Sequence, residues 1–272
     1  MIPSCASKYT YLNDKIVLSQ DVDLPLATHV IYDVIRVTEG IPLFLESHAE
    51  RFFNSFRLAS LPYPFQKNKF YRAVQYLINY LPISFGNIRV AYYVANSPIF
   101  IVYQVEHSYP NRELYFTGVS SSLFRAEREN PAIKQELQVR TLANNAIKER
   151  DVYDVILVDS DENVREGSRT NLFFVKGNEL ITSLANDVLG GITRKKVIEL
   201  HKELGLTLVE KKISVSELES FDAAFFTGTS PKVLPIANID SLKFDVSNPA
   251  LLKIMQSFDE KIKQYLIDIK KI

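Results

Sequence analysis

The residue with the clearest capacity for chemistry in this chain of 272 residues is a carboxylate, Glu166. Two runs rich in β-branched and aromatic residues, Asp154–Val158 and Leu172–Val175, flank it, with turn-forming residues at 160–163 between them. This pattern predicts a β-hairpin that carries Glu166 into apolar surroundings. Because a buried carboxylate is unfavourable unless a cation or a donor meets it, we expect a positive group beside Glu166. A solvated glutamate in a hairpin turn is the alternative.

A lysine upstream, Lys134, could act on a carbonyl group. It lies in Asn130-Pro-Ala-Ile-Lys-Gln135, after a predicted strand and before a predicted helix. A lysine that faces a buried carboxylate can lose its water, have its pKa lowered and form a Schiff base with an aldehyde cofactor. An ordinary solvated lysine is the alternative reading of the same residue. Lys148 is a rival, but it falls inside a predicted helix, where a solvated face explains it.

An anion could bind where the run Leu189-Gly-Gly-Ile-Thr-Arg194 begins a predicted helix. The first N–H groups of a helix have no acceptor within it, and the helix dipole places partial positive charge at the same end. The N–H groups of Ile192 and Thr193 therefore predict a site for a phosphate group. Otherwise the two glycines mark only a turn.

The elements that must position these groups form two predicted lobes, residues 1–112 and 113–272. Pro110 and Asn111 mark the connection, because they interrupt the hydrophobic pattern. Residues 1–25 have only a weak pattern. The expected elements of the first lobe are strands over Thr28–Val37 and Ile41–Leu45, helices over Glu46–Leu61 and Asn68–Leu81, and strands over Asn87–Val94 and Ile99–Val105.

The second lobe mixes strands and helices around the central hairpin. Its last helix should begin with Asn248 as cap and Pro249 at the first position. The other expected elements are a strand over Leu114–Val119 followed by a loop, a helix over Val139–Arg150, a strand near Leu180, a helix through Val197, Leu200 and Leu204, and strands over Leu206–Glu210 and Ala223–Thr227.

Charge and composition limit the classes of partner. Hydrophobic residues make up 46% of the chain, enough for a sizeable core in one or two domains. The 32 basic and 32 acidic residues leave no net charge, so neither a nucleic acid nor an anionic membrane is predicted as a partner. A small molecule is the expected partner.

Cysteine content and local patterns argue against a metal site and an oxidising compartment. The single cysteine, Cys5, excludes an intramolecular disulfide and a cysteine-based zinc cluster. The turn Asp159–Asn163 begins like a calcium loop, yet Val164 stands where the loop needs glycine, so no metal is predicted. No signal-peptide pattern and no membrane-spanning run is present, which predicts a soluble, cytoplasmic protein.

Taken in order, these motifs resemble the class IV aminotransferases, the fold-type IV pyridoxal-phosphate enzymes, which include branched-chain and D-amino-acid aminotransferases and aminodeoxychorismate lyase. The segment from Glu166, Glu-Gly-Ser-x-Thr-Asn-Leu-Phe, is similar to the family's Glu-Gly-Ser-x-Ser-Asn-x-Phe. The resemblance covers about residues 28–240. It implies an α/β (α+β) fold of two lobes, a small N-terminal α+β lobe and a larger C-terminal lobe with a β-barrel-like sheet core, with the cofactor in the cleft between them.

The resemblance also implies a role for each candidate residue. Glu166 would pair with the protonated ring nitrogen of pyridoxal 5'-phosphate and keep the ring an electron sink. Lys134 would hold the cofactor and move the substrate Cα proton as general base and acid. The remaining cofactor residues implied are Arg51, in a Glu-x-His-x-x-Arg helix, with Ile192, Thr193, Thr229 and Ser230 at the phosphate, and Leu189 against one face of the ring.

Substrate residues are the least defined by the sequence. Arg89, in Asn-Ile-Arg-Val, resembles a pocket arginine that binds a substrate carboxylate in some members of the family. Tyr32, Arg36 and His107 also lie on or near strands of the first lobe and could reach the substrate. For each of them the alternative is an ordinary core or rim residue.

Two departures from the family pattern keep alternatives open. Ala27-Thr-His-Val-Ile replaces the usual Gly-Asp-Gly or Gly-Asp-Ser, and Gln138 and Val139 stand where a tyrosine often follows the lysine. We expect a homodimeric aminotransferase that acts on an amino acid and a 2-oxo acid. A lyase on the same scaffold, a non-catalytic member of the fold, and an unrelated α/β binding protein are the alternatives.

Overall fold

The computed structural model describes residues 2–128, 130–135 and 138–271, and the chain divides into two units. Unit 1 consists of Met1–Ser108, Ile133–Glu136 and Gln264–Ile272, and unit 2 consists of Tyr109–Ala132 and Leu137–Lys263. The short segment with Lys134 therefore belongs to unit 1, although the chain on both sides of it belongs to unit 2. The side chain of Gln138, one of the two departures noted above, lies outside the described residues.

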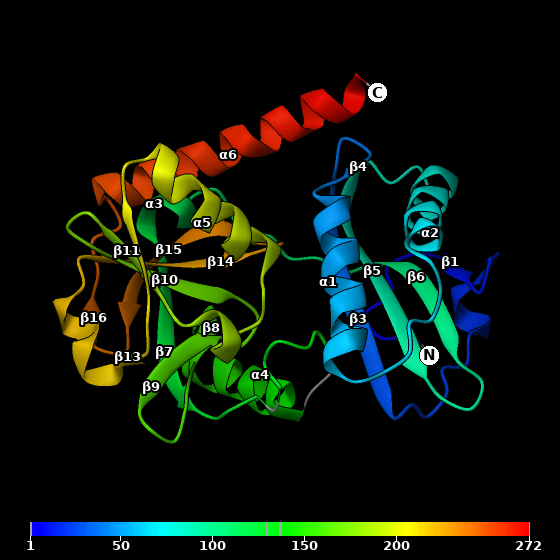
Figure 1. The fold of residues 1–272 in the computed structure, drawn as a ribbon, viewed down its shortest axis with the longest axis horizontal. Helices are drawn as coiled ribbons and strands as arrows, with labels where there is room; N and C mark the ends of the chain where they lie inside the picture. The colour runs from blue at the N-terminus through cyan, green and yellow to red at the C-terminus, as the bar shows by residue number, and fades with distance from the viewer. Residues whose placement is uncertain (1, 129, 136–137, 272) are drawn as a thin grey trace. The chain divides into compact units, whose positions relative to one another are not determined.

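Unit 1 is built on a six-stranded antiparallel sheet with the order β2-β1-β6-β5-β3-β4 (Figure 1). Helices pack on one of its faces. The elements of unit 1 are β1 (Tyr9–Leu12), β2 (Lys15–Leu18), the 3-10 turn η1 (Ser19–Asp21), β3 (His29–Thr38), β4 (Ile41–Pro42), α1 (Leu45–Leu58), α2 (Lys67–Tyr80), β5 (Phe85–Val94) and β6 (Ile99–Val105).

Alternation along β3 separates the two faces of this sheet. Ile31 and Ile35 are fully buried and share an apolar core with Phe52 and Phe56 of α1. Successive side chains of a strand point to opposite faces, so Tyr32 lies on the face away from α1 and α2. One face of the sheet thus builds the core, and the other is available for polar groups.

Most elements of unit 1 follow the sequence pattern. Strands β3, β5 and β6 and helices α1 and α2 lie close to their predicted ranges. The strand predicted over Ile41–Leu45 is wrong beyond Pro42: Phe44 takes a left-handed conformation with φ of 52°, and α1 starts at Leu45. The short strands β1 and β2 lie in the stretch whose pattern was too weak to predict them.

Unit 2 is built on a ten-stranded sheet that curls into a half-barrel (Figure 1). The strand order is β12-β11-β10-β14-β15-β7-β8-β9-β13, and β16 pairs with β15. Its elements are α3 (Leu114–Thr117), β7 (Val119–Arg125), α4 (Gln138–Arg150), β8 (Asp154–Val158), β9 (Asn163–Gly167), β10 (Asn171–Lys176), β11 (Glu179–Thr182), η2 (Ala185–Asp187), α5 (Ile192–Glu203), β12 (Thr207–Glu210), β13 (Ile213–Ser214), η3 (Val215–Ser220), β14 (Ala223–Gly228), β15 (Lys232–Ile239) and β16 (Leu242–Lys243). The last helix, α6 (Pro249–Lys270), starts in unit 2 and ends in unit 1.

The predicted central hairpin is wrong in its second strand. β8 pairs with β9, with Val158 opposite Val164, whereas β10 pairs with β11 and β14. The side chain of Asp159 explains the early turn, because its Oδ1 accepts hydrogen bonds from the N–H groups of Asp161 and Asn163 at 2.9 and 2.8 Å. The chain therefore reverses at once, and Glu166 lies within a strand rather than in a loop after the turn.

Other parts of unit 2 confirm or correct the predicted elements. Leu114–Thr117 is helical where a strand was predicted, and the strand β7 begins only at Val119. Helices α4 and α5 and strands β11, β12 and β14 follow the predictions. Asn248 caps α6 as predicted, since its Oδ1 accepts the N–H groups of Ala250 and Leu251 at 3.0 and 3.3 Å.

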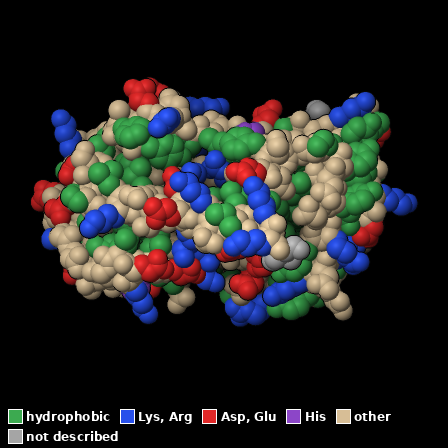
Figure 2. Space-filling view, turned by 90° about the horizontal axis from the view of Figure 1, so that it is seen from above, with side chains coloured by type: hydrophobic (Ala, Val, Ile, Leu, Met, Phe, Trp, Pro, Cys, Tyr) green, Lys and Arg blue, Asp and Glu red, His purple; other side chains and the backbone are tan. Residues whose placement is uncertain are grey.

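Surface charge is mixed over the face shown in Figure 2, where basic and acidic side chains alternate instead of forming one basic patch. Among the described helices, none combines the length and the apolar composition that crossing a lipid bilayer requires.

Candidate active site

Glu166 is a buried carboxylate of β9 with three donors around it. Its side chain is 2% exposed, and Arg128 Nη1 donates to Oε1 at 2.7 Å. Oε2 accepts Asn171 Nδ2 at 2.9 Å and the N–H of Leu189 at 3.1 Å. The positive group expected beside Glu166 is therefore present within the chain itself. Together the three donors offset the unfavourable burial of a charged carboxylate.

Asn171 connects this carboxylate to the start of α5. Its Nδ2 donates to the carbonyl of Leu189, at 2.9 Å, as well as to Glu166. A Cβ atom built on Gly191 would lie 1.9 Å from Asn171 Oδ1. Gly191 therefore allows the side chain of Asn171 to approach the start of α5 closely, whereas the Cβ of any other residue would block it. Leu189, predicted to pack against a ring, is 7% exposed and is fixed by both of its backbone contacts.

The start of α5 has the geometry predicted for an anion site. Gly191 is its N-cap residue, and no described side chain caps the helix there. The first-turn N–H groups of Ile192 and Thr193 thus point out of the helix end, where its dipole attracts negative charge. Thr229 and Ser230 lie in the turn between β14 and β15, and β14 contacts α5.

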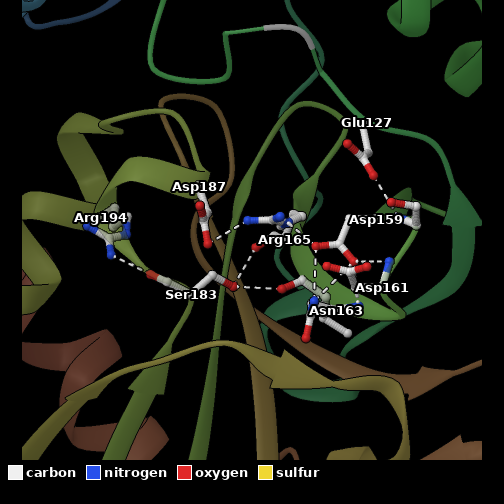
Figure 3. A network of polar contacts seen from close by, with 10 residues as sticks. Glu127, Asp159, Asp161, Asn163, Arg165, Ser183, Asp187 and Arg194 are labelled. Carbon is white, nitrogen blue, oxygen red and sulfur yellow. Dashed lines mark hydrogen bonds and ion pairs between the residues drawn. The ribbon is translucent and has the colours of Figure 1, made fainter.

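A second network holds the chain around Leu189 in place (Figure 3). Arg165, the neighbour of Glu166 in β9, forms salt bridges of 2.5 Å with both Asp159 and Asp187. Ser183 Oγ donates to the Arg165 carbonyl at 2.7 Å, and Arg194 Nη2 donates to the Ser183 carbonyl at 2.9 Å. Burial opposes the ionisation of Asp159, but hydrogen bonds and the Arg165 charge outweigh it and hold its pKa below the ordinary value. The start of α5 is thus anchored on β9.

The loop between β9 and β10 is organised by Asp154, which is fully buried. Its carboxylate accepts Ser168 Oγ at 2.6 Å, Thr170 Oγ1 at 2.8 Å and the N–H of Arg169 at 3.2 Å. This loop separates Glu166 from Asn171, so Asp154 sets their spacing. The sequence predicted Asp154 only as part of a strand and missed its role in this loop. The signal for that role was an acidic residue at the start of an otherwise apolar strand.

Both backbone groups of Lys134 are bound within unit 1, one to α1 and the other to β3. Its N–H donates to Ser55 Oγ at 3.2 Å, and its carbonyl accepts the N–H of Tyr32 at 3.0 Å. A β-bridge joins the next residue, Gln135, to Ile31. Since β4 pairs only with the far end of β3, the segment adds to the open part of that strand. The Nζ atom lies 5.2 Å from the centroid of the Tyr32 ring.

Arg51 is oriented by a buried acid, Asp33. Its Nε and Nη2 donate to the two carboxylate oxygens at 2.8 and 2.6 Å, and His48 Nδ1 lies 2.8 Å from Oδ1. Burial opposes the ionisation of Asp33, yet Arg51 and His48 hold its pKa far below the ordinary value. Burial lowers the pKa of His48, more than Asp33 raises it. Sequence analysis identified Arg51 and missed Asp33.

The predicted substrate residues form two pairs in unit 1. Arg89 lies with its Cζ 4.0 Å from the centroid of the Tyr32 ring. Arg36 Cζ lies 5.6 Å from the centroid of Phe85, and the His107 ring lies 5.7 Å from the same centroid. The register pairs Val34 with Arg89 and so puts Tyr32, Arg36 and Arg89 on the face away from α1 and α2.

The family model described as amino-transferase class IV matches residues 30–239. A relative from Rickettsia typhi, named a probable branched-chain-amino-acid aminotransferase, is 26% identical over 86% of this chain and 88% of its own length.

Two solved structures show the same fold. The branched-chain amino acid aminotransferase from Escherichia coli superimposes with a TM-score of 0.85 at 21% identity, over 94% of each chain. A branched-chain amino acid aminotransferase from T.th., solved with pyridoxamine 5'-phosphate, also gives a TM-score of 0.85, at 20% identity over 96% of each chain.

Proposed function

The chain belongs to the class IV aminotransferase family, and from that premise we propose that it exchanges an amino group between a branched-chain amino acid and a 2-oxo acid, with pyridoxal 5'-phosphate as cofactor. Membership makes it an enzyme of the aminotransferase class. The name of the Rickettsia typhi relative, which matches most of the chain, supports branched-chain amino acids as substrates.

The described residues fit the three chemical features of the cofactor. A buried carboxylate, Glu166, suits a protonated ring nitrogen. Arg128 and Asn171 hold this carboxylate in position even when no cofactor is bound. The uncapped start of α5, at Ile192, suits a phosphate group. Lys134 offers a primary amine on a segment that is fixed at both backbone groups. The close approach at Gly191, where a Cβ would meet Asn171, keeps the carboxylate and the helix start in one compact arrangement.

Glu166 carries the proposal, because a fully buried carboxylate with this much support is unusual outside a functional site. When bound, pyridoxal phosphate supplies an electron sink for the electrons left on the substrate Cα. The negative charge of Glu166 supports a positive charge on the ring nitrogen and so strengthens that sink. Arg128 and Asn171 hold the carboxylate in a fixed direction for this purpose.

Lys134 is the proposed catalytic residue. Its Nζ would hold the cofactor before substrate arrives. It would then take the proton from the substrate Cα as general base and, as general acid, deliver it to the cofactor rather than back to Cα. Because the backbone of Lys134 is bound at its N–H and at its carbonyl, only the side chain has to move during this exchange. Because the backbone of Lys134 does not move, its amine can reach only a limited set of positions, which favours a constant reaction geometry.

We assign the cofactor phosphate to the N–H groups of Ile192 and Thr193, the hydroxyls of Thr229 and Ser230, and the guanidinium of Arg51. Asp33 fixes the plane of that guanidinium through two hydrogen bonds, which suits a planar donor fork. Leu189 is assigned to one face of the ring.

Substrate binding is assigned to the polar face of the six-stranded sheet. Arg89 would bind the substrate carboxylate, and Arg36 and His107, which share contacts with Phe85, would lie farther along the same sheet. Tyr32 lies beside Arg89. We further propose that the protein works as a cytoplasmic homodimer, in keeping with the family and with a single cysteine.

The test begins with the visible spectrum of the purified protein after addition of pyridoxal 5'-phosphate. Borohydride should then fix the cofactor onto Lys134, as found by mass spectrometry of a digest, and leucine with 2-oxoglutarate should give glutamate. An adduct on Lys148 or Lys176, or no adduct, contradicts the assignment. Release of pyruvate without a 2-oxo acid acceptor would identify a lyase instead.

A further inference from the structure

Tyr32 contacts Lys134 in two independent ways. Its backbone N–H donates to the Lys134 carbonyl at 3.0 Å, and its ring centroid lies 5.2 Å from Nζ. The tyrosine is 4% exposed and stands in a strand of ten residues that pairs along its whole length with β5. The ring is therefore a fixed surface on which a mobile lysine side chain can rest.

Arg89 reaches the same ring from the other side of β3. It comes from β5, which pairs with β3 along one edge, whereas the segment of Lys134 bridges the opposite edge through Gln135. Its Cζ lies 4.0 Å from the ring centroid. Both cations are attracted by the negative face of an aromatic ring, while they repel each other. The Tyr32 ring thus contacts two like charges, the Arg89 guanidinium and the Lys134 amine.

We infer that Tyr32 is a positioning residue whose ring sets the separation between the amine of Lys134 and the guanidinium of Arg89. The inference rests on the proposed function, in which Lys134 moves the Cα proton and Arg89 binds the substrate carboxylate. These two substrate groups are joined by a single bond, so their partner groups in the protein must keep a constant distance. A displacement of about 1 Å can lower the rate of such a reaction about a hundredfold.

The flat ring, rather than the hydroxyl, provides this spacing. Tyr32→Phe keeps the ring and the backbone contact with Lys134, and Tyr32→Leu keeps apolar volume and the backbone contact but removes the flat face. Comparing the two variants therefore separates the ring from everything else that Tyr32 does. Tyr32→Met replaces Tyr32→Leu if the leucine variant does not fold, because methionine adapts to irregular spaces.

The experiment uses full-length protein reconstituted with pyridoxal 5'-phosphate. We expect borohydride to fix the cofactor onto Lys134 in the wild type and in both variants, because the backbone contacts remain. In Tyr32→Leu, the visible circular dichroism of the bound cofactor should fall, and kcat for the leucine half-reaction should fall about tenfold to a hundredfold. Tyr32→Phe should lose much less than Tyr32→Leu in both measurements, because it keeps the flat ring. Thermal unfolding checks that each variant is folded.

A second comparison tests the role of Arg89. If the ring acts by spacing two charged groups, Tyr32→Leu should cost much less in an Arg89→Met background than in the wild type, since only one group is left to position. Additive effects would overturn the inference.

Other outcomes separate this inference from the function on which it rests. A wild type that forms no adduct on Lys134 overturns both. A wild type that forms the adduct and transaminates, beside a folded Tyr32→Leu variant with unchanged circular dichroism and kcat, overturns the role of Tyr32 alone. Equal losses in Tyr32→Phe and Tyr32→Leu would assign the effect to the hydroxyl and overturn the role of the ring.

Discussion

Asp33 in unit 1 and Glu166 in unit 2 are both buried carboxylates that pair with an arginine, but their surroundings are built differently. In unit 1, Asp33 is held by His48 and Arg51, which lie three positions apart on one helix. In unit 2, Glu166 is held by Arg128, Asn171 and the backbone of Leu189, which come from three separate segments. The donors to Asp33 thus lie close together in the sequence, whereas the donors to Glu166 come from distant parts of the chain.

This difference suggests different roles: Asp33 orients another side chain, whereas Glu166 acts on a bound ligand. Asp33 is fully buried against α1, so its charge acts on Arg51 and on the stability of unit 1. Glu166 lies next to the start of α5 through Asn171, so its charge is placed beside groups that can bind a ligand. Changes at Glu166 should therefore affect the rate of reaction most, and changes at Asp33 should affect the free energy of unfolding most.

The largest effect should follow from Glu166→Gln, which keeps shape but removes the charge. The amino-acid half-reaction should slow about a thousandfold, on the order of 4 kcal/mol. Stopped-flow absorbance of the reconstituted enzyme measures it. Glu162→Gln is the control and should react as the wild type does. Glu162 lies in the turn between β8 and β9, is exposed and pairs with Arg125. A normal rate in Glu166→Gln would reduce that residue to a structural role.

Asp33→Ala should be the most destabilising change in unit 1. It leaves the guanidinium of Arg51 and the ring of His48 without their buried partner, which lowers the free energy of unfolding by about 3–5 kcal/mol. Urea denaturation followed by circular dichroism measures the loss. Asp259→Ala, which breaks an exposed salt bridge of 2.7 Å to Lys232, is the control and should lose about 0–1 kcal/mol. Similar losses in the two variants would remove the distinction between them.

Arg51→Ala tests whether the oriented guanidinium of unit 1 serves the phosphate. The dissociation constant for pyridoxal 5'-phosphate should rise about tenfold to a hundredfold, in line with roughly 1.5–3 kcal/mol for a hydrogen bond to a charged group. Titration of the folded apoprotein, followed by absorbance, measures it. Arg57→Ala, on the same helix with its guanidinium bound to Asn54, is the control. Unchanged affinity in Arg51→Ala would remove Arg51 from the proposed phosphate site.

The smallest effect should be a dependence of stability on pH that comes from Asp33. Its pKa lies below the ordinary value in the folded protein, so the unfolded chain binds the proton more readily. The stabilisation is complete above the unfolded pKa of about 4 and is lost as the pH falls below it. Between about pH 6 and pH 3, wild type should therefore lose more free energy of unfolding than Asp33→Asn. Parallel losses would show that the depressed pKa does not contribute.

The sequence predicted the groups in unit 2 that depend on local order. Glu166 stands in a motif that also fixes Asn171, and the start of α5 follows from two glycines and the helical pattern after them. Arg128 could not be predicted as the partner of Glu166, because 38 positions separate them and only the curl of the sheet brings them together. The hairpin prediction failed on a side-chain detail, the capture of two N–H groups by Asp159.

Unit 1 shows the opposite balance. From β3 to β6 its strands and helices follow alternation and helical spacing, which are local properties, and these elements were predicted. The placement of Lys134 on β3 was not, because it depends on a pairing with residues about a hundred positions earlier that carries no pattern of its own. The lysine was predicted from its motif, and its neighbours Ser55 and Tyr32 come from the structure alone.

The attachment of Lys134 to β3 also sets an order of events during folding. Its partner in α1, Ser55, lies 79 positions earlier and its partner in β3, Tyr32, lies earlier still. Both contacts close long loops, and such contacts form late because the loss of chain entropy comes first. The last strand of the sheet ends at Val105, so the whole sheet is synthesised, and emerges from the ribosome, before the lysine does. In a newly made chain, the partners of Lys134 in β3 and α1 are thus available before the lysine that pairs with them.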